Sequence, residues 1–262
     1  MSQHLVTLEI EGGFARLRMR RGEARNAIDR ALAEALHEAI SDCAGRVDVR
    51  VVLLSAEGSA FSVGGDLAHL HQALDRLPSE LEAMISTYHA ALAQLASMPA
   101  PVVCAVQGGV GGGGLGLIWC SDVVIAADNV KLASGFPRLG FSGDGGSSWA
   151  LTRLVGARRA WEFLAGGRVL SAREAAEWGL VSAVVPSDQL QTAAESAASR
   201  LAVGPTRAYT ELRALIRRGL SSELTEQLDA ERQAMIRLSR SDDVLEGIDA
   251  FIQRREPRFT GS

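Results

Sequence analysis

The sequence is poor in cysteine and has no long apolar run. Its three cysteines, Cys43, Cys104 and Cys120, lie among apolar residues and show no Cys-x-x-Cys spacing. We therefore expect reduced thiols in the core, with no role as metal ligands. No apolar stretch approaches the roughly 18 residues of a membrane-spanning helix, and the first residues lack the basic and apolar regions of a signal peptide. These absences predict a cytoplasmic protein that does not contact membranes.

The sequence also lacks a block of basic charge. Its 262 residues carry a net charge of −4, with 47% hydrophobic and 22% charged residues. This balance is ordinary for a globular protein and disfavours nucleic acid as a partner. The length suits one large α/β domain with a helical appendix.

The pattern along the chain predicts an α/β core followed by helices. Alternating apolar residues predict a hairpin, with strands over 5–10 and 14–19. Asp29 is expected to cap a helix that is apolar at Leu32, Leu36 and Ile40. From residue 206 to 255 the pattern is that of three charged helices. We expect the core to cover residues 1–195 and the helical region residues 196–262.

Glycine is concentrated in one short run. Seven of the 27 glycines lie within nine positions between Val106 and Leu117. Such a run suits either a tightly packed crossing or a loop whose backbone N–H groups approach a negative oxygen. Further glycine loops occur at residues 62–66 and 140–148, and each of the three follows an expected strand. Open α/β folds place ligands at strand ends, and the third loop adds an acid, Asp144.

Several motifs have competing interpretations. The spacing Gly109-x-Gly111-x-x-Gly114, with Asp128 downstream, matches a dinucleotide fingerprint. Only about eight residues then separate the last glycine from the next strand, which is short for a crossover helix. Asp144 could instead cap the next helix, and Asp122 is expected to orient backbone. Surface or structural roles are expected for the helical histidines, His69, His71 and His89.

The order of these segments resembles the crotonase (enoyl-CoA hydratase/isomerase) superfamily over nearly the whole chain. The segments that carry the resemblance are Arg25–Ile28, Phe61–Leu67, Pro101–Asp122, Arg153–Gly156, Ala175–Val181 and Glu246–Gly261. The resemblance implies a spiral of ββα units, a C-terminal helical trimerisation region and an acyl-CoA thioester substrate, with no separate cofactor or metal. It also implies a homotrimer or a dimer of trimers.

The same resemblance assigns site residues by position. The amides of Val63 and Gly113 would form an oxyanion hole for the thioester carbonyl. Phe251 and Arg254 stand where family members often reach the CoA of a neighbouring subunit. The residues that would line the pantetheine and adenine path are Arg25, Ala27, Ser62, Gly64, Asp66 and Leu67.

Two departures from the hydratase pattern stand out. Enoyl-CoA hydratases carry one catalytic glutamate where this chain has Gly116, and a second in a Pro-Glu step where Pro137-Arg138 stands. The acid that remains, Asp144, resembles that of the single-aspartate branch, which holds 1,2-epoxyphenylacetyl-CoA isomerases, double-bond isomerases and dehalogenases. A dehalogenase is disfavoured because Phe136 replaces its tryptophan and Ala93 falls where its histidine is expected.

These observations favour an acyl-CoA isomerase in which Asp144 moves a proton next to the thioester. One carboxylate suffices to shuttle a proton, whereas adding water usually needs a second group. Two alternatives stay open: an enoyl-CoA hydratase, and a protein that binds acyl-CoA without catalysis.

Overall fold

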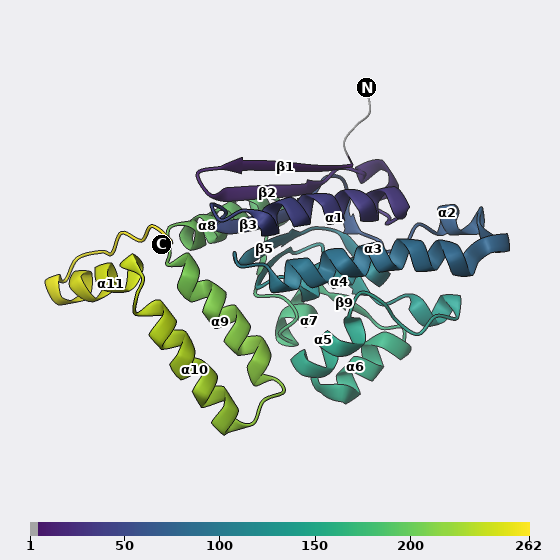
Figure 1. Ribbon diagram of the computed structural model, residues 1–262. Coiled ribbons are helices and arrows are strands. Elements are labelled where there is room, and N and C mark those ends of the chain that lie inside the picture. The colour runs from purple at the N-terminus through teal and green to yellow at the C-terminus, as the bar shows by residue number, and fades with distance from the viewer. Residues whose placement is uncertain (1–4) are drawn as a thin grey trace.

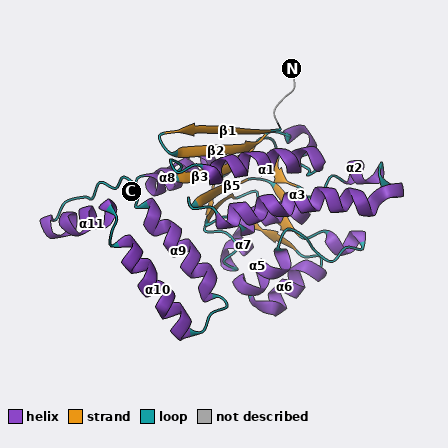
Figure 2. Cartoon of the chain, viewed as in Figure 1, coloured by secondary structure: helices purple, strands orange, loops and turns teal. Residues whose placement is uncertain are grey.

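The computed structural model describes residues 5–262, so the first four residues of the expected core lie outside the described residues. Two sheets lie among layers of helices (Figures 1 and 2), in the order β1-β2-β3-β5-β7-β10 and β4-β6-β8-β9. The strands of the first sheet are β1 (Val6–Glu11), β2 (Phe14–Met19), β3 (Val51–Ala56), β5 (Val102–Val106), β7 (Val123–Ala127) and β10 (Ala183–Val185). Those of the second are β4 (Ala60–Ser62), β6 (Gly109–Gly111), β8 (Lys131–Ala133) and β9 (Val169–Ser171).

The helices fall into those that pack on the sheets and those of the C-terminal region. The first group is α1 (Arg30–Gly45), α2 (Leu67–His71), α3 (Leu77–Ser97), α4 (Leu115–Trp119), α5 (Ser147–Leu154), α6 (Gly156–Ala165), α7 (Ala172–Glu177) and α8 (Leu190–Ala202). The C-terminal helices are α9 (Thr206–Gly219), α10 (Leu224–Leu238) and α11 (Asp242–Gln253). The three helices expected between residues 206 and 255 are thus confirmed.

The N-terminal hairpin and the first helix also form as expected. Strands β1 and β2 pair antiparallel from Val6 opposite Met19 to Glu11 opposite Phe14. Asp29 caps α1 by accepting a hydrogen bond from the Leu32 amide at 2.8 Å. The apolar stripe of α1 is fully buried and faces α3. Strands β3 and β5 are buried on both faces, as parallel strands covered by helices are.

Helix α8 belongs to the layer that covers the larger sheet. Its buried residues, Leu190, Ala194, Ala197 and Ala198, lie on the face that contacts β3, β5 and β7. The boundary expected between residues 195 and 196 falls inside this helix. Helix α8 therefore spans the expected boundary, and the division of the chain into a core and a helical region stays a prediction.

The C-terminal helices extend away from the layers (Figure 1). Many of their apolar side chains are exposed. One buried arginine ties α9 to the core: Arg213 is only 8% exposed and pairs with Asp122 at 2.8 Å. Its guanidinium also donates to the carbonyl oxygens of Met98 and Ala100, where α3 ends. The exposed apolar residues are Leu212, Ile216, Leu220, Leu224, Leu228, Met235, Ile236, Leu245, Ile248, Phe251 and Ile252.

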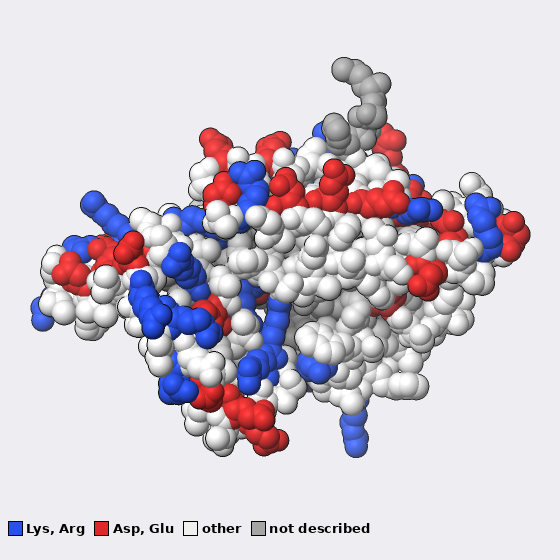
Figure 3. Space-filling model, viewed as in Figure 1, with Lys and Arg blue, Asp and Glu red and all other residues white. Residues whose placement is uncertain are grey.

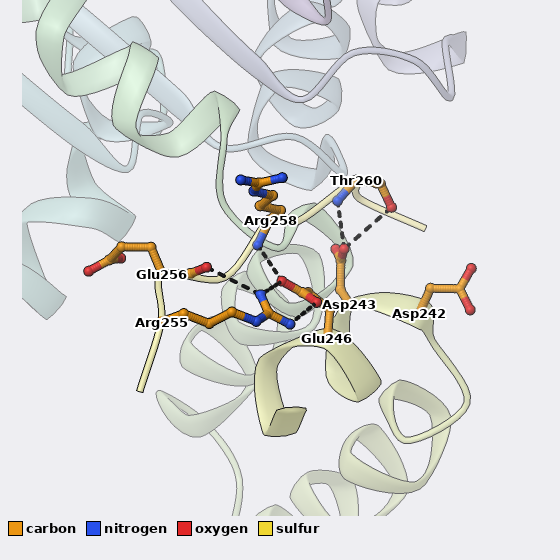
Figure 4. A pocket seen from close by; sticks show the side chains of 7 residues that line it. All are labelled: Asp242, Asp243, Glu246, Arg255, Glu256, Arg258 and Thr260. Atoms are coloured by element: carbon orange, nitrogen blue, oxygen red, sulfur yellow. Dashed lines mark hydrogen bonds and ion pairs between the residues drawn. The ribbon is translucent and has the colours of Figure 1, made fainter. Parts of the chain in front are cut away.

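The last residues of the chain fold back onto α11 (Figure 4). The buried carboxylate of Asp243 accepts hydrogen bonds from the amides of Thr260 and Gly261 at 2.7 and 2.9 Å. Glu246 accepts from the Arg255 guanidinium at 2.6 Å and from the Arg258 amide at 2.7 Å. These bonds surround a polar cavity of 610 Å³.

The contacts of Glu246 predict that the tail loosens in acid. The Arg255 guanidinium, assisted by the Arg258 amide, lowers the pKa of Glu246 from 4.5 to about 2. A lowered folded-state pKa contributes stability above pH 4.5 that is lost as the pH falls toward 2. We expect the amide chemical shift of Arg258 to titrate with an apparent pKa near 2, and Glu246→Gln to abolish that titration. An apparent pKa near 4.5 would contradict these contacts, and Glu256→Gln is the matched control, since the Glu256 side chain is exposed.

Charge is distributed unevenly over the surface. Figure 3 shows acidic side chains in a row along α1, while basic side chains gather over α9 and α10. An anionic ligand therefore meets less repulsion near the C-terminal helices than near α1. Within residues 5–262, no helix combines the length and apolarity needed to cross a membrane.

Candidate active site

The glycine loops come together at the ends of strands in the smaller sheet, where β4 and β6 pair in parallel. A Cβ placed on Gly64 would lie 2.8 Å from the Gly111 carbonyl oxygen, and one on Gly114 would lie 2.7 Å from the Ser62 carbonyl oxygen. These positions admit only glycine because the neighbouring atoms are backbone. Tight packing was one of the two uses expected of the glycine run, and it explains the glycine at Gly114 within that run.

Gly113 is where the glycine run meets the acid of the third loop. A Cβ on this residue would lie 3.3 Å from Oδ2 of Asp144 and 3.6 Å from the ring of Tyr88. The Tyr88 hydroxyl donates a 2.7 Å hydrogen bond to the Gly113 carbonyl oxygen. The structure thus brings together Gly113 and Asp144, two residues to which the sequence assigned chemical roles.

Asp144 does not cap the following helix. Helix α5 begins after Gly146, which has a φ of +72°. No side chain accepts a capping hydrogen bond from the first amides of this helix. The Asp144 carboxylate instead contacts His89 of α3, with Oδ1 2.6 Å from Nε2. The Asp144 side chain is 22% exposed, so a ligand can reach it. The capping interpretation is therefore wrong, and the carboxylate is available for chemistry.

The contact of His89 with Asp144 is a feature of the candidate site that the sequence interpretation missed. His89 was expected to be a surface or structural histidine, and the histidine of a dehalogenase was placed at Ala93. The structure brings His89, one helical turn earlier, against Asp144. A signal was present in the sequence, because Tyr88, Leu92 and Leu95 form the buried stripe of α3 and His89 borders that stripe.

The space of the first hydratase glutamate is filled in this chain. A Cβ on Gly116 would lie 2.7 Å from both the Gly145 carbonyl oxygen and Cδ1 of Leu92. No longer side chain fits there while the third glycine loop keeps its place. At the second glutamate position, Arg138 is exposed. The ring of Phe136 lies 3.8 Å from the Cβ position of Gly112, beside the glycine run.

The second expected oxyanion donor already has a partner. The Val63 amide donates to the Arg25 carbonyl oxygen at 3.2 Å. A thioester oxygen would have to share or replace this long bond. Ser62, which neighbours Val63, is fully buried, and its hydroxyl donates to the Asn26 carbonyl oxygen at 2.8 Å. The Ser62 side chain therefore faces the interior of the protein and ties the loop of residues 62–66 to Asn26.

The residues expected along the CoA path differ in whether a ligand can reach them. Asp66 caps α2 by accepting from the Ala68 and His69 amides, and its other oxygen pairs with Arg21 at 2.8 Å. Gly64 needs its φ of +88°. Ala27 is buried, Leu67 is 52% exposed and Arg25 is exposed. Arg25 and Leu67 are thus accessible to a ligand, while the Asp66 carboxylate is occupied within the chain.

Phe251 and Arg254 lie far from these loops in the same chain. Both belong to the end of α11, at the opposite side of the molecule from α2 (Figure 1). Phe251 is 85% exposed. Any contact that these two residues make with CoA would have to be with a ligand bound to a neighbouring chain.

Other candidate groups have structural roles. Asp122 accepts from the Val102 amide at 2.7 Å, as expected. The dinucleotide interpretation is wrong, because Gly109–Gly111 forms strand β6 and not a turn before a helix. Burial raises the pKa of Cys104 to about 12, which keeps this thiol protonated at neutral pH. Throughout residues 5–262, no three His, Cys, Asp or Glu side chains gather as a metal ion would require.

Known proteins share both this sequence pattern and this fold. The Enoyl-CoA hydratase/isomerase family model matches residues 9–262. The chain is 34% identical to a probable enoyl-CoA hydratase of Rhodobacter capsulatus, over 100% of both chains. It is 33% identical to a 1,2-epoxyphenylacetyl-CoA isomerase of Escherichia coli, over 98% of each. A Mycobacterium abscessus structure described as an enoyl-CoA hydratase/isomerase has a TM-score of 0.94 and 36% identity, over 98% of this chain and 100% of that one.

The family model and the fold thus place this chain among the enzymes of the crotonase superfamily. The chain belongs to the enoyl-CoA hydratase/isomerase family. The expected α/β crotonase fold is confirmed.

Proposed function

We propose that this protein is an acyl-CoA isomerase in which Asp144 is the single base. Asp144 takes a proton from the carbon next to the thioester carbonyl, or from its vinylogous position. The enolate oxygen that forms is stabilised by the Gly113 amide, and by the Val63 amide once that amide shares or releases its bond to the Arg25 carbonyl oxygen. The proton then returns to a different carbon, so the double bond moves and no atom is gained or lost.

The observation that carries this proposal is the place of the Asp144 carboxylate against Gly113. With Oδ2 3.3 Å from the Cβ position of Gly113, a thioester whose oxygen lies on the glycine loop has its α-carbon near the base. The packing of Gly116 against Gly145 and Leu92 leaves no room for a hydratase glutamate at that position. One base beside one oxyanion site supports proton transfer better than the addition of water.

His89 gives the base a fixed direction. Its Nε2 lies 2.6 Å from Oδ1 of Asp144, which leaves Oδ2, the oxygen nearer Gly113, to face the substrate. A carboxylate held at one oxygen loses rotational freedom before the substrate binds, and such preorganisation lowers the barrier. His89 acts here as a positioning residue.

Two substrates separate isomerisation from hydration. Incubation with a 3-enoyl-CoA tests movement of the double bond, and incubation with crotonyl-CoA tests loss of the conjugated enoyl absorbance by hydration. We expect isomerisation to be faster. Faster hydration would favour the hydratase alternative, and binding of a panel of CoA thioesters without either reaction would favour a non-catalytic protein.

Dehalogenation is a second candidate. The sequence placed the histidine of a dehalogenase at Ala93, but His89 lies one turn earlier on the same helix and contacts Asp144. A histidine beside a carboxylate suits an aspartate that attacks the carbon bearing the halogen and so forms an ester as halide leaves. Water, deprotonated by the histidine, then hydrolyses this ester and restores the aspartate. Phe136 argues against it, since its ring lacks the N–H donor of the tryptophan. Release of chloride from 4-chlorobenzoyl-CoA, abolished by Asp144→Asn, would establish this reaction, and its absence would exclude this substrate.

The exposed apolar surface of α9–α11 supports a proposed trimer or dimer of trimers. Apolar side chains line a groove of 450 Å³ between α9 and α11 that includes Ile248, Phe251 and Phe259. Apolar surface of this extent on projecting helices is typical of a subunit interface. Phe251 and Arg254 would then approach the CoA of the next chain.

The cytoplasmic location stays a prediction.

Removal of α11 tests this assembly. We expect light scattering at micromolar concentration to give an oligomer for the full chain, and truncation after Arg240 to shift the mass toward the monomer and weaken CoA-ester binding. A monomeric full chain would refute the proposal. So would a truncated chain that stays oligomeric with unchanged affinity.

A further inference from the structure

Helix α3 contacts both halves of the proposed site through two consecutive residues. Tyr88 donates its hydroxyl hydrogen bond to the Gly113 carbonyl oxygen at 2.7 Å. His89, the next residue, lies 2.6 Å from the Asp144 carboxylate. One rigid helix of 21 residues therefore contacts the loop that would bind the thioester oxygen and the base that would take the proton.

The oxyanion loop needs an external anchor. Glycine populates both signs of φ with little cost, so a run of glycines does not hold its N–H groups in one direction by itself. Gly112 has a φ of +49° and begins the turn Gly112–Gly114 that leads into α4, with Gly113 at its centre. An amide that changes direction by a few tens of degrees no longer points at a bound carbonyl oxygen, and its stabilisation of negative charge falls.

The Tyr88 hydroxyl is suited to be that anchor. The ring is 2% exposed and packs in the core with Leu92 and Leu95, so its direction is set by packing. Burial, with smaller contributions from Cys120, Asp144 and Cys104, raises the pKa of Tyr88 well above its ordinary value. The hydroxyl therefore remains protonated, and able to donate a hydrogen bond, at neutral pH.

We propose that Tyr88 is a positioning residue that holds the Gly113 turn so that its amide polarises the thioester carbonyl. The inference rests on the proposed function for the place of the thioester. It goes beyond that function because it says what orients the Gly113 amide. The orienting group is the Tyr88 side chain, which lies in the core and does not touch the substrate. The bond to Gly113 and the bond to Asp144 share α3, so the oxyanion donor and the base keep a constant separation.

The variant Tyr88→Phe removes the hydroxyl and keeps the ring. The measurement is the infrared stretching frequency of the thioester carbonyl in a bound enoyl-CoA, which falls when the oxygen accepts strong hydrogen bonds. We expect Tyr88→Phe to lose at least about half of the downshift seen in the wild type and to lower kcat about tenfold, with KM within about threefold. A purely structural role would leave the downshift of the folded fraction unchanged.

A matched control removes a comparable bond elsewhere. The Thr210 hydroxyl donates to the Pro99 carbonyl oxygen at 2.8 Å, outside the site, and Thr210→Val should leave the downshift and kcat unchanged. If Tyr88→Phe does not fold, 3-fluorotyrosine at position 88 is the second variant, since it keeps the hydroxyl and makes it a stronger donor. The chain has two tyrosines, so incorporation in a Tyr209→Phe background labels Tyr88 alone, and the downshift should not decrease.

The readout separates this inference from the proposed reaction. A bound thioester shows its carbonyl frequency whether or not the enzyme moves a proton, so absence of isomerase activity with a Tyr88-dependent downshift leaves the inference standing. A wild-type downshift that Tyr88→Phe does not change overturns the inference alone. No downshift in the wild type overturns both the role of the Gly113 amide and the inference.

Discussion

Replacing Asp144 by Asn should lower isomerase turnover by at least about a hundredfold while leaving the affinity for CoA esters nearly unchanged. The amide of Asn cannot accept the substrate proton, but it fills the same volume beside Gly113. The thioester should still bind, because the residues expected to contact CoA lie on other loops. The measurements are kcat with a 3-enoyl-CoA and Kd by calorimetry with a saturated acyl-CoA.

The control for this variant is a carboxylate that lies away from the site. Asp128 accepts a hydrogen bond from the Ser187 hydroxyl at 2.5 Å and contacts none of the three glycine loops in the hydrogen bonds of the described residues. Asp128→Asn should therefore retain full turnover. If Asp144→Asn also retained full turnover, the residue would have no part in the mechanism.

Replacing Arg213 by Leu should give the largest loss of stability, about 3–5 kcal/mol in the free energy of unfolding. The substitution leaves the Asp122 carboxylate without its partner at 2.8 Å. It also leaves the carbonyl oxygens of Met98 and Ala100 without the guanidinium, at a buried junction between α3 and α9. The loss is large because these carbonyl oxygens are buried, and each buried acceptor left without a donor costs about 1–3 kcal/mol. The Asp122 side chain, which is 24% exposed and keeps its bond from the Val102 amide, contributes less to the loss.

Denaturant unfolding at one fixed protein concentration measures this effect, since assembly would make stability depend on concentration. Arg218→Leu is the matched control, because Arg218 lies on the same helix and is exposed. It should change the free energy of unfolding by less than about 0.5 kcal/mol. Equal losses in the two variants would show that Arg213 does not anchor α9.

Local patterns predicted most of the elements around the site. The alternation before and after Gly12 and Gly13 predicted the hairpin, and the spacing of Leu32, Leu36 and Ile40 behind Asp29 predicted α1 with its cap. These features depend on near neighbours in the chain, which a single sequence displays. Asp144 could be singled out because it is an acid within a glycine loop.

Contacts between distant segments were not predictable in the same way. His89 and Asp144 are 55 residues apart, and only the packing of α3 against the glycine loops brings them together. Likewise, the bond from the Val63 amide to Arg25 and the filled space beside Gly116 follow from how three loops stack. Periodicity shows which face of a helix is buried, but it does not show which loop that face will meet.

Exchange of the α-hydrogen of a bound acyl-CoA with solvent deuterium tests the central claim most directly. A saturated thioester that cannot isomerise is incubated with the enzyme in deuterated water, and its mass is followed with time. The account predicts deuterium at the carbon next to the carbonyl with the wild type and a rate at least about a hundredfold lower with Asp144→Asn. Exchange that proceeds equally fast in both proteins would contradict the assignment of Asp144 as the base.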